Sequence, residues 1–243
     1  MPGGQEFMAE RIPGKAPAKA VQQSGSVRAF LDALKRTPPA VAGQGRLIFA
    51  LDATISREPT WDMACAIQAN MFEEAGASGR LSVQLAYFRG FNEFAASPWT
   101  GDARSLAALM TGVQCRGGYT QIGRVLSHAV AETRRQTVRA VVYVGDAFEE
   151  DIDHVSAKAG ELGLLGVPVF TFHEGGEAAA ARAFKEIARL TRGAYCAFDA
   201  GAARQLRELL RAVAAYAAGG RTALEAHGQR TGGSALKLLA QMR

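Results

Sequence analysis

The sequence has few cysteines and no long apolar run. Its three cysteines, Cys65, Cys115 and Cys196, lie too far apart for the CxxC pairs of a structural zinc site. Their odd number does not suggest a disulfide framework, so we expect a reducing, cytoplasmic environment. No apolar segment approaches the roughly 18 residues of a membrane span. The first residues also lack the apolar core of a secretory signal, and we expect no contact with a membrane.

The net charge of +5 is divided unevenly along a chain of ordinary globular composition. Residues 1–46 carry seven basic and three acidic side chains, and residues 201–243 carry seven and two, whereas the segment between them is mildly acidic. Basic tails attract nucleic acid or acidic protein surfaces, but more often they only keep a protein soluble. RNA binding therefore stays open as an alternative, although the sequence shows no aromatic strip for stacking bases.

Short apolar runs alternate with helical patterns along most of the chain. Residues 47–51 form an unbroken apolar run, which is typical of a central parallel strand covered on both faces. Further strands are predicted at 81–88, 91–99, 139–145, 167–172 and 194–198, and helices at 26–36, 60–76, 102–112, 121–133, 177–191 and 202–218. Another helix is predicted to start in the acidic segment 149–153.

This alternation predicts a doubly wound α/β fold with a mainly parallel six-stranded sheet and helices on both faces. The link at residues 89–92 suggests a hairpin, so the short strand at 91–99 is expected to be antiparallel and to lie at an edge.

The composition divides the chain into four parts. Residues 1–25 are rich in proline, glycine, alanine and lysine, and we expect a disordered basic tail. Residues 26–43 contain a short amphipathic helix and a linker, and residues 44–217 form the α/β domain. Residues 218–243 are polar and glycine-rich, and we expect a partly disordered extension.

A carboxylate and two hydroxyls follow the first strand, at Asp52, Thr54 and Ser56. Alternate residues of an extended segment point the same way, so these oxygens converge at the carboxyl end of a strand, where open α/β sheets bind ligands. Hard oxygens suit Mg²⁺ or Mn²⁺ rather than Zn²⁺. The alternative is that Ser56 is the N-cap of a helix that begins with Glu58 and Pro59.

Two further polar residues are predicted at the same edge of the sheet. Thr120 follows a glycine pair and begins a helix, and Asp146 ends a strand. With the first three residues they provide two carboxylates and three hydroxyls. Two negative charges leave a divalent ion electrophilic, so it can take a carboxylate from outside as its last ligand. We expect Asp52 to lie at the rim, so that its removal abolishes metal binding without unfolding the domain.

Three motifs occur here in the order and spacing of a known family: Asp52-x-Thr54-x-Ser56, Gly117-Gly-Tyr-Thr120-Gln-Ile-Gly123 and Val141-Val-Tyr-Val-Gly-Asp146. Over residues 44–217 the sequence resembles a von Willebrand factor A domain of the intracellular bacterial type, with its metal-ion-dependent adhesion site. The resemblance implies that Thr54, Ser56 and Thr120 bind Mg²⁺ or Mn²⁺ directly. It also implies that Asp52 and Asp146 bind the ion directly or through water, and that an acidic residue of a partner completes the octahedron.

The function implied by this resemblance is a non-catalytic, metal-dependent protein-binding module or adaptor. It would grip an Asp or Glu of a protein partner, and an AAA+ ATPase is one partner class that the resemblance suggests. Two departures from the family pattern are Thr54, where serine is usual, and Ala147, where glycine commonly follows the last aspartate. The acidic residues 149–153 could supply an alternative ligand, but a solvated helix start is the simpler interpretation.

A Mg²⁺-dependent hydrolase of the haloacid dehalogenase type is the second alternative, because it also begins with an aspartate at a strand end. That chemistry needs another carboxylate two residues later, where Thr54 stands. It also needs a lysine for the phosphate, and the sequence offers none near Asp146. The sequence therefore favours a binding module over an enzyme.

Overall fold

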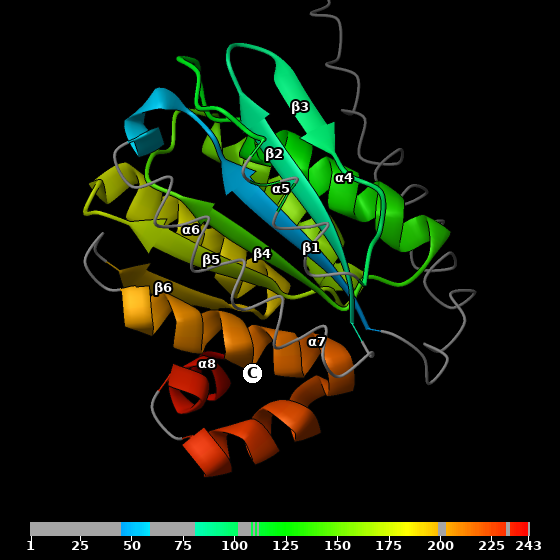
Figure 1. The fold of residues 1–243 in the computed structure, drawn as a ribbon. Helices are drawn as coiled ribbons and strands as arrows, with labels where there is room; N and C mark the ends of the chain where they lie inside the picture. Colours follow the sequence, from blue (N-terminus) through cyan, green and yellow to red (C-terminus); the bar gives the residue numbers. More distant parts are fainter. Residues whose placement is uncertain are drawn as a thin grey trace, which may run out of the picture. The chain divides into compact units, whose positions relative to one another are not determined.

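A six-stranded sheet forms the centre of the computed structural model, which describes residues 45–58, 81–101, 108, 110, 112–198, 203–231 and 234–242 (Figure 1). The strands are β1 (Gly45–Asp52), β2 (Leu81–Arg89), β3 (Glu93–Ala96), β4 (Ala140–Gly145), β5 (Val169–Glu174) and β6 (Ala194–Phe198). The helices are the short 3₁₀ helix η1 (Ile55–Arg57), α4 (Ile122–Arg135), α5 (Ile152–Leu164), α6 (Ala178–Thr191), α7 (Ala203–Thr231) and α8 (Ser234–Gln241).

The strand order is β3-β2-β1-β4-β5-β6, and every pair is parallel except β2 with β3. This confirms the predicted fold, with its short antiparallel strand at one edge. The order reverses between β1 and β4, which lie side by side at the centre of the sheet. Open α/β sheets bind their ligands at such a point, just beyond the carboxyl ends of the strands.

Alternate side chains of β1 pack into two separate hydrophobic cores, one on each face of the sheet. Leu47, Phe49 and Leu51 belong to a buried cluster that includes residues of α7 and α8. Ile48 and Ala50 belong to the other cluster, which includes residues of α4, α5 and α6. Because side chains alternate along a strand, helices cover both faces, as predicted (Figure 1).

The C-terminal part of the chain differs from the expected partly disordered extension. The predicted helix end near residue 218 agrees with the structure, because Gly219 and Gly220 have non-helical backbone angles and divide α7 into two helical parts, with φ 68° at Gly220. Beyond this break, Leu224 and Leu238 are fully buried in the same core as Leu47 and Phe49. The segment after the glycine pair is therefore helical, and its apolar residues pack back onto the domain.

Several predicted segments lie outside the described residues. These are the basic tail at 1–25, the helix and linker at 26–43, and most of the predicted helices at 60–76 and 102–112. Among the helices that the structure describes, none is both long and apolar enough to cross a membrane.

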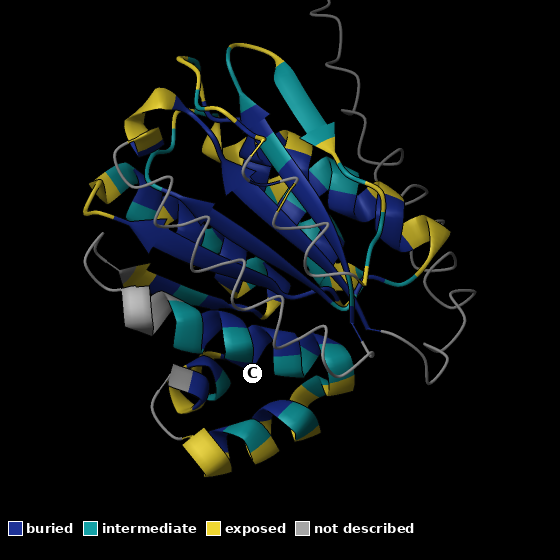
Figure 2. Cartoon of the chain, viewed as in Figure 1, coloured by how far each residue is buried: buried dark blue, intermediate teal, exposed yellow. Residues whose placement is uncertain are grey.

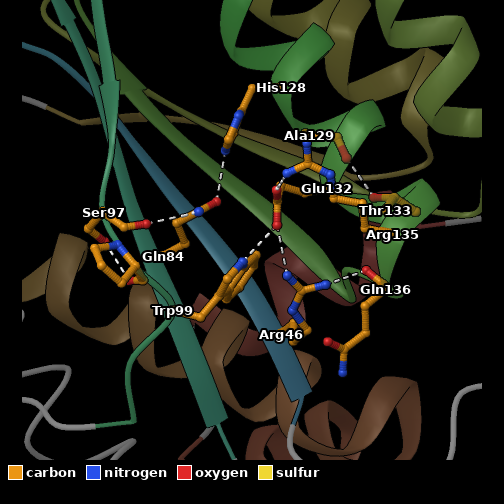
Figure 3. Close-up of polar contacts among 11 residues, drawn as sticks. Arg46, Gln84, Ser97, Trp99, His128, Ala129, Glu132, Thr133, Arg135 and Gln136 are labelled. Atoms are coloured by element: carbon orange, nitrogen blue, oxygen red, sulfur yellow. Dashed lines mark hydrogen bonds and ion pairs between the residues drawn. The ribbon is translucent and has the colours of Figure 1, made fainter.

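A buried polar network joins the start of β1 to α4 (Figure 3). The Glu132 carboxylate accepts hydrogen bonds from Arg46 Nη2 at 2.8 Å, Trp99 Nε1 at 2.7 Å and Arg135 Nη1 at 2.9 Å. The Arg46 guanidinium also lies 3.7 Å from the centre of the Trp99 ring. A charge buried in this way is tolerated because it is paired and hydrogen-bonded. The network fixes the end of β1 that lies away from Asp52.

Candidate functional site

The first motif folds into a compact turn directly after β1. The Thr54 backbone N–H donates to Asp52 Oδ1 at 2.8 Å, and the hydroxyls of Thr54 and Ser56 are 3.0 Å apart. Ser56 lies inside η1, and its hydroxyl bonds to that of Thr54 rather than capping that helix. The structure therefore brings the carboxylate and both hydroxyls together, as the alternating spacing predicted.

Asp52 is completely buried and does not lie at the rim, so the expected location was wrong. As the last residue of the central strand, it lies between β2, where it pairs with Phe88, and the end of β4. The pKa of Asp52 is raised to about 6, mainly by burial and to a smaller extent by the negative charge of Asp146, while hydrogen bonds from Thr54 oppose both effects. Among the described residues, Asp52 Oδ2 has no hydrogen-bond partner.

Asp146 follows the last residue of β4, next to Asp52 at the point where the strand order reverses. Its Oδ1 is also buried and lacks a hydrogen-bond partner within the described part of the chain. The Tyr143 hydroxyl is a third buried oxygen of this kind in the same ranges. A Cβ on Gly145 would overlap that hydroxyl, so the glycine leaves space for it. Sequence reasoning missed Tyr143, because its position in an apolar strand predicts only core packing.

Thr120 is buried at the start of α4 and is tied to the loop that follows Asp146. Its backbone N–H donates to Glu149 Oε2 at 3.1 Å, and the Glu149 N–H donates to Thr120 Oγ1 at 3.0 Å. A hydroxyl oxygen has two lone pairs, so accepting one hydrogen bond leaves the other available to a metal ion. The structure thus connects the second motif with the third through Glu149.

The acidic segment is not simply a solvated helix start, and this interpretation was wrong for two of its residues. Glu150 accepts hydrogen bonds from the backbone N–H groups of Ile122 and Gly123, so with Glu149 it covers the amino end of α4. Only Asp151 caps its own helix, α5, by accepting from the His154 N–H at 2.8 Å. Free N–H groups at a helix start attract carboxylates, and here a neighbouring loop supplies them.

Two further residues lie near the site: Ala147, which departs from the family pattern, and Arg57. Ala147 does not have a positive φ, so its backbone conformation does not require glycine. Arg57, directly after Ser56, is 1% exposed, and its Nη1 lies 2.8 Å from Glu174 Oε2 at the end of β5. This buried ion pair attaches η1 to the sheet edge, and the Arg57 charge lowers the pKa of Asp52. An arginine in a polar link gave no sign in the sequence that it would be buried.

The donor set fits a hard cation. Across the described ranges, no group of three or more His, Cys, Asp or Glu side chains gathers as a metal cluster. A shell here would consist of two carboxylates with hydroxyls, which is the oxygen chemistry that Mg²⁺ and Mn²⁺ prefer. Asp52 Oδ2 and Asp146 Oδ1, which lack hydrogen bonds within the described residues, are the atoms that a cation would satisfy. Metal binding by the five predicted residues stays a prediction.

Comparison with known proteins reveals similarity at the level of structure alone. No protein-family model and no curated protein sequence matches the chain. The SpRpn10 VWA domain is similar in structure, with a TM-score of 0.55 and 12% identity over 67% of this chain and 95% of that domain. The vWF domain of the pili tip protein Mfa5 from Porphyromonas gingivalis has a TM-score of 0.60 and 10% identity over 72% of this chain and 95% of its own.

The chain has a von Willebrand factor A fold. The pilus adhesin SpaC from Lactobacillus rhamnosus GG contains the same fold within a longer protein, with a TM-score of 0.58 and 11% identity. That match covers 74% of this chain but 31% of the adhesin. In this fold Asp52 ends β1, and the other predicted site residues lie on the segments that follow β1 and β4 or precede α4.

Proposed function

We propose that this von Willebrand factor A domain is a non-catalytic module that binds a protein partner through a divalent cation. Asp52, Thr54, Ser56, Thr120 and Asp146 would hold Mg²⁺ or Mn²⁺, and an Asp or Glu of the partner would be the last ligand. The bound ion would supply the positive charge that attracts this carboxylate. The residues of the chain would fix the position of the ion and leave one side of it open.

One observation carries this proposal. Asp52 Oδ2 and Asp146 Oδ1 are both buried without a hydrogen-bond partner among the described residues, and they belong to neighbouring strand ends. A buried carboxylate oxygen without a partner costs folding free energy on the order of 1–3 kcal/mol or more. A bound cation would satisfy both oxygens and remove this cost, which gives the arrangement a physical reason.

The partner is proposed to be a protein that presents an acidic side chain. The similar structures include a pilus adhesin and a VWA domain of SpRpn10, which fits a role in binding rather than catalysis. An AAA+ ATPase is the partner class that we would test first, on the basis of the sequence resemblance. We place the protein in the cytoplasm, which is supported by the free thiols of Cys115 and Cys196.

The deciding experiment is a calorimetric titration of metal-stripped protein with Mg²⁺ and Mn²⁺. The matched variants are Thr120→Ala, which removes a predicted ligand, and Thr133→Ala. Thr133 is also buried but lies in the last turn of α4, where its hydroxyl donates to the Ala129 carbonyl at 2.7 Å. We expect both ions to bind the wild type and Thr133→Ala but not Thr120→Ala.

Equal binding by the two variants would contradict the proposed ligand set. Absence of binding to the wild type, with and without a peptide that carries an aspartate, would contradict metal dependence itself. The fold of each variant is checked by thermal unfolding, so that loss of the site is distinguished from loss of the domain.

A further inference from the structure

Four of the large apolar side chains that the structure exposes lie on the connections at the edge that carries the candidate site. They are Ile55 in η1, Phe91 in the β2–β3 turn, Tyr119 just before Thr120, and Ile152 at the start of α5. Figure 2 shows exposed segments gathered along this edge, toward which the arrows of β1, β2 and β4 point. Contiguous exposed apolar surface with a polar rim is typical of a binding surface.

Phe91 and Tyr119 form the centre of this surface. Phe91 is 75% exposed and Tyr119 is 59% exposed, yet their rings contact each other edge to face, with centroids 5.5 Å apart. The rings come from two connections that are far apart in the sequence. An exposed aromatic pair of this kind offers a large contact area to a partner, and aromatic side chains are common among the residues that dominate binding energy.

Hydrogen bonds hold the two connections in place. The Gln121 side-chain amide donates to the carbonyls of Arg89 and Gly90, at 3.2 and 3.3 Å. Arg89 Nη1 donates to the Gln114 carbonyl at 2.9 Å, and Arg124 Nη1 donates to the Asn92 carbonyl at 3.0 Å. The aromatic pair is therefore held in position before any partner arrives, which lowers the entropy lost on binding.

The same connections join the aromatic pair to the candidate metal site. The Arg116 backbone N–H donates to the Ala53 carbonyl at 3.1 Å, and the backbones of Arg116 and Thr54 pair in an isolated parallel β-bridge. Tyr119 immediately precedes Thr120 in the chain. A partner segment that binds at the site from this side is therefore close to Tyr119 and to the ring that it contacts.

The charge beside the rings favours an acidic partner. Three cations, Arg89, Arg116 and Arg124, lie on or hydrogen-bond to the connections that carry the rings, and one carboxylate, Glu93, pairs with Arg89 and Arg116. The net charge of these four side chains is therefore positive. The exposed Glu149 and Asp151 on the connection after β4, and Asp153 at the start of α5, would repel an extended polyanion such as RNA, whereas a single acidic residue can bind beside the arginines without reaching them.

We propose that Phe91 and Tyr119, with Arg116 and Arg124 beside them, bind a partner segment in which bulky apolar side chains flank an acidic residue. The apolar side chains contact the rings, and the acidic residue reaches the cation of the neighbouring site. The inference rests on the proposed function for this last contact, whereas the contact with the rings needs no metal.

The test uses three synthetic peptides with a fluorescent label. The first is Gly-Gly-Phe-Asp-Leu-Gly-Gly, the second replaces its Phe and Leu by Gly, and the third replaces its Asp by Asn. Binding to the full chain is measured by fluorescence anisotropy with Mg²⁺ and with EDTA, and oligouridylate is the competing probe. The variants are Phe91→Ser with Tyr119→Ser, and Leu164→Ser as a control on a side chain that is 53% exposed at the end of α5.

We expect the wild type and Leu164→Ser to prefer the first peptide over the second by about tenfold, which is the effect of one strong aromatic contact. The aromatic double variant should lose this preference while its Mg²⁺ titration stays unchanged. A double variant that keeps the preference overturns the inference, as does binding of no peptide or tighter binding of oligouridylate.

These results separate the inference from the proposed function. If the Asp and Asn peptides bind equally and Mg²⁺ has no effect, the metal-dependent function fails. The ring contact still stands in that case, provided that the double variant loses the preference for Phe and Leu. If binding depends on Mg²⁺ and Asp but not on the rings, the proposed function stands and the inference fails.

Discussion

Thr120 and Glu149 exchange two hydrogen bonds, one from the Thr120 N–H to the Glu149 carboxylate and one from the Glu149 N–H to the Thr120 hydroxyl. The Thr120 hydroxyl is thereby fixed relative to the loop that begins with Asp146. Both hydrogen bonds are made within the protein. Protein contacts therefore join the segment that carries Thr120 to the loop that begins with Asp146, and both segments carry a predicted metal ligand.

Replacing Glu149 by alanine should weaken Mg²⁺ binding by about three- to tenfold. The variant loses the acceptor that orients Thr120 and a negative charge close to the ion, which together contribute on the order of 1 kcal/mol. Calorimetry of the metal-stripped protein measures the change.

The control for this variant is Glu177→Ala. Glu177 caps α6 by accepting from the N–H groups of Ala179 and Ala180, so its loss removes a similar cap from a helix that carries none of the motif residues. Both variants should lose roughly 1 kcal/mol of unfolding free energy. Equal Mg²⁺ affinity in the two variants would show that Glu149 does not position Thr120.

Asp52→Asn should stabilise the metal-free protein at neutral pH. The pKa of Asp52 in the folded protein is about 6, above the roughly 3.9 of an unfolded chain. The stability that comes from the protonated form is thus fully present below about pH 4 and is lost as the pH rises through 6. At pH 7 the variant, which stays neutral, should be more stable than the wild type by roughly 2–3 kcal/mol.

Denaturant unfolding in EDTA between about pH 4 and pH 8 measures this difference. The advantage of Asp52→Asn should vanish near pH 4, where the wild-type carboxyl is also neutral. Adding Mg²⁺ should stabilise the wild type and not the variant. A difference between the two proteins that does not change with pH would show that Asp52 keeps an ordinary pKa.

The sequence predicted the parts of the molecule that depend on local patterns. The apolar run of β1 and the alternation of strands and helices were sufficient for the fold, and the spacing of Asp52, Thr54 and Ser56 predicted their convergence. The pairing of Arg57 with Glu174 was not predicted, because these residues are far apart in the chain and become neighbours only in the folded sheet.

The same reason explains the wrong interpretation of the acidic loop, and why the packing of the C-terminal segment was not predicted. Glu149 and Glu150 lie beside a helix start in sequence, yet they bond to α4, which precedes them in the chain. Residues 218–243 are polar and glycine-rich, and this composition predicted a partly disordered extension. Whether such a segment folds depends on the packing of Leu224 and the residues after it against the domain, which no local pattern contains.

Gly118→Ala should disturb the site, whereas Gly117→Ala should not. A Cβ on Gly118 would overlap the backbone of Gly90, which cannot move aside without displacing the β2–β3 turn. A Cβ on Gly117 meets no described atom within 4 Å. We expect Gly118→Ala to cost about 1–3 kcal/mol of unfolding free energy and to weaken Mg²⁺ binding, because Thr120 follows two residues later. Thermal unfolding and calorimetry of the two variants check this, and equal behaviour would contradict the close packing of these connections.

Variants of Arg57 and Glu174 test whether the ion pair or apolar packing stabilises the position of η1. Both side chains are almost fully buried, so Arg57→Met leaves Glu174 as a buried charge without its 2.8 Å partner and should cost about 3–5 kcal/mol. Combining it with Glu174→Met removes both charges, and the double variant should recover most of this loss because the two apolar side chains have similar volume. Denaturant unfolding of the two single variants and the double variant gives the coupling energy of the pair. Additive losses would show that the two charges do not stabilise each other. In that case the packing around η1, rather than the ion pair, would place Ser56 beside Thr54.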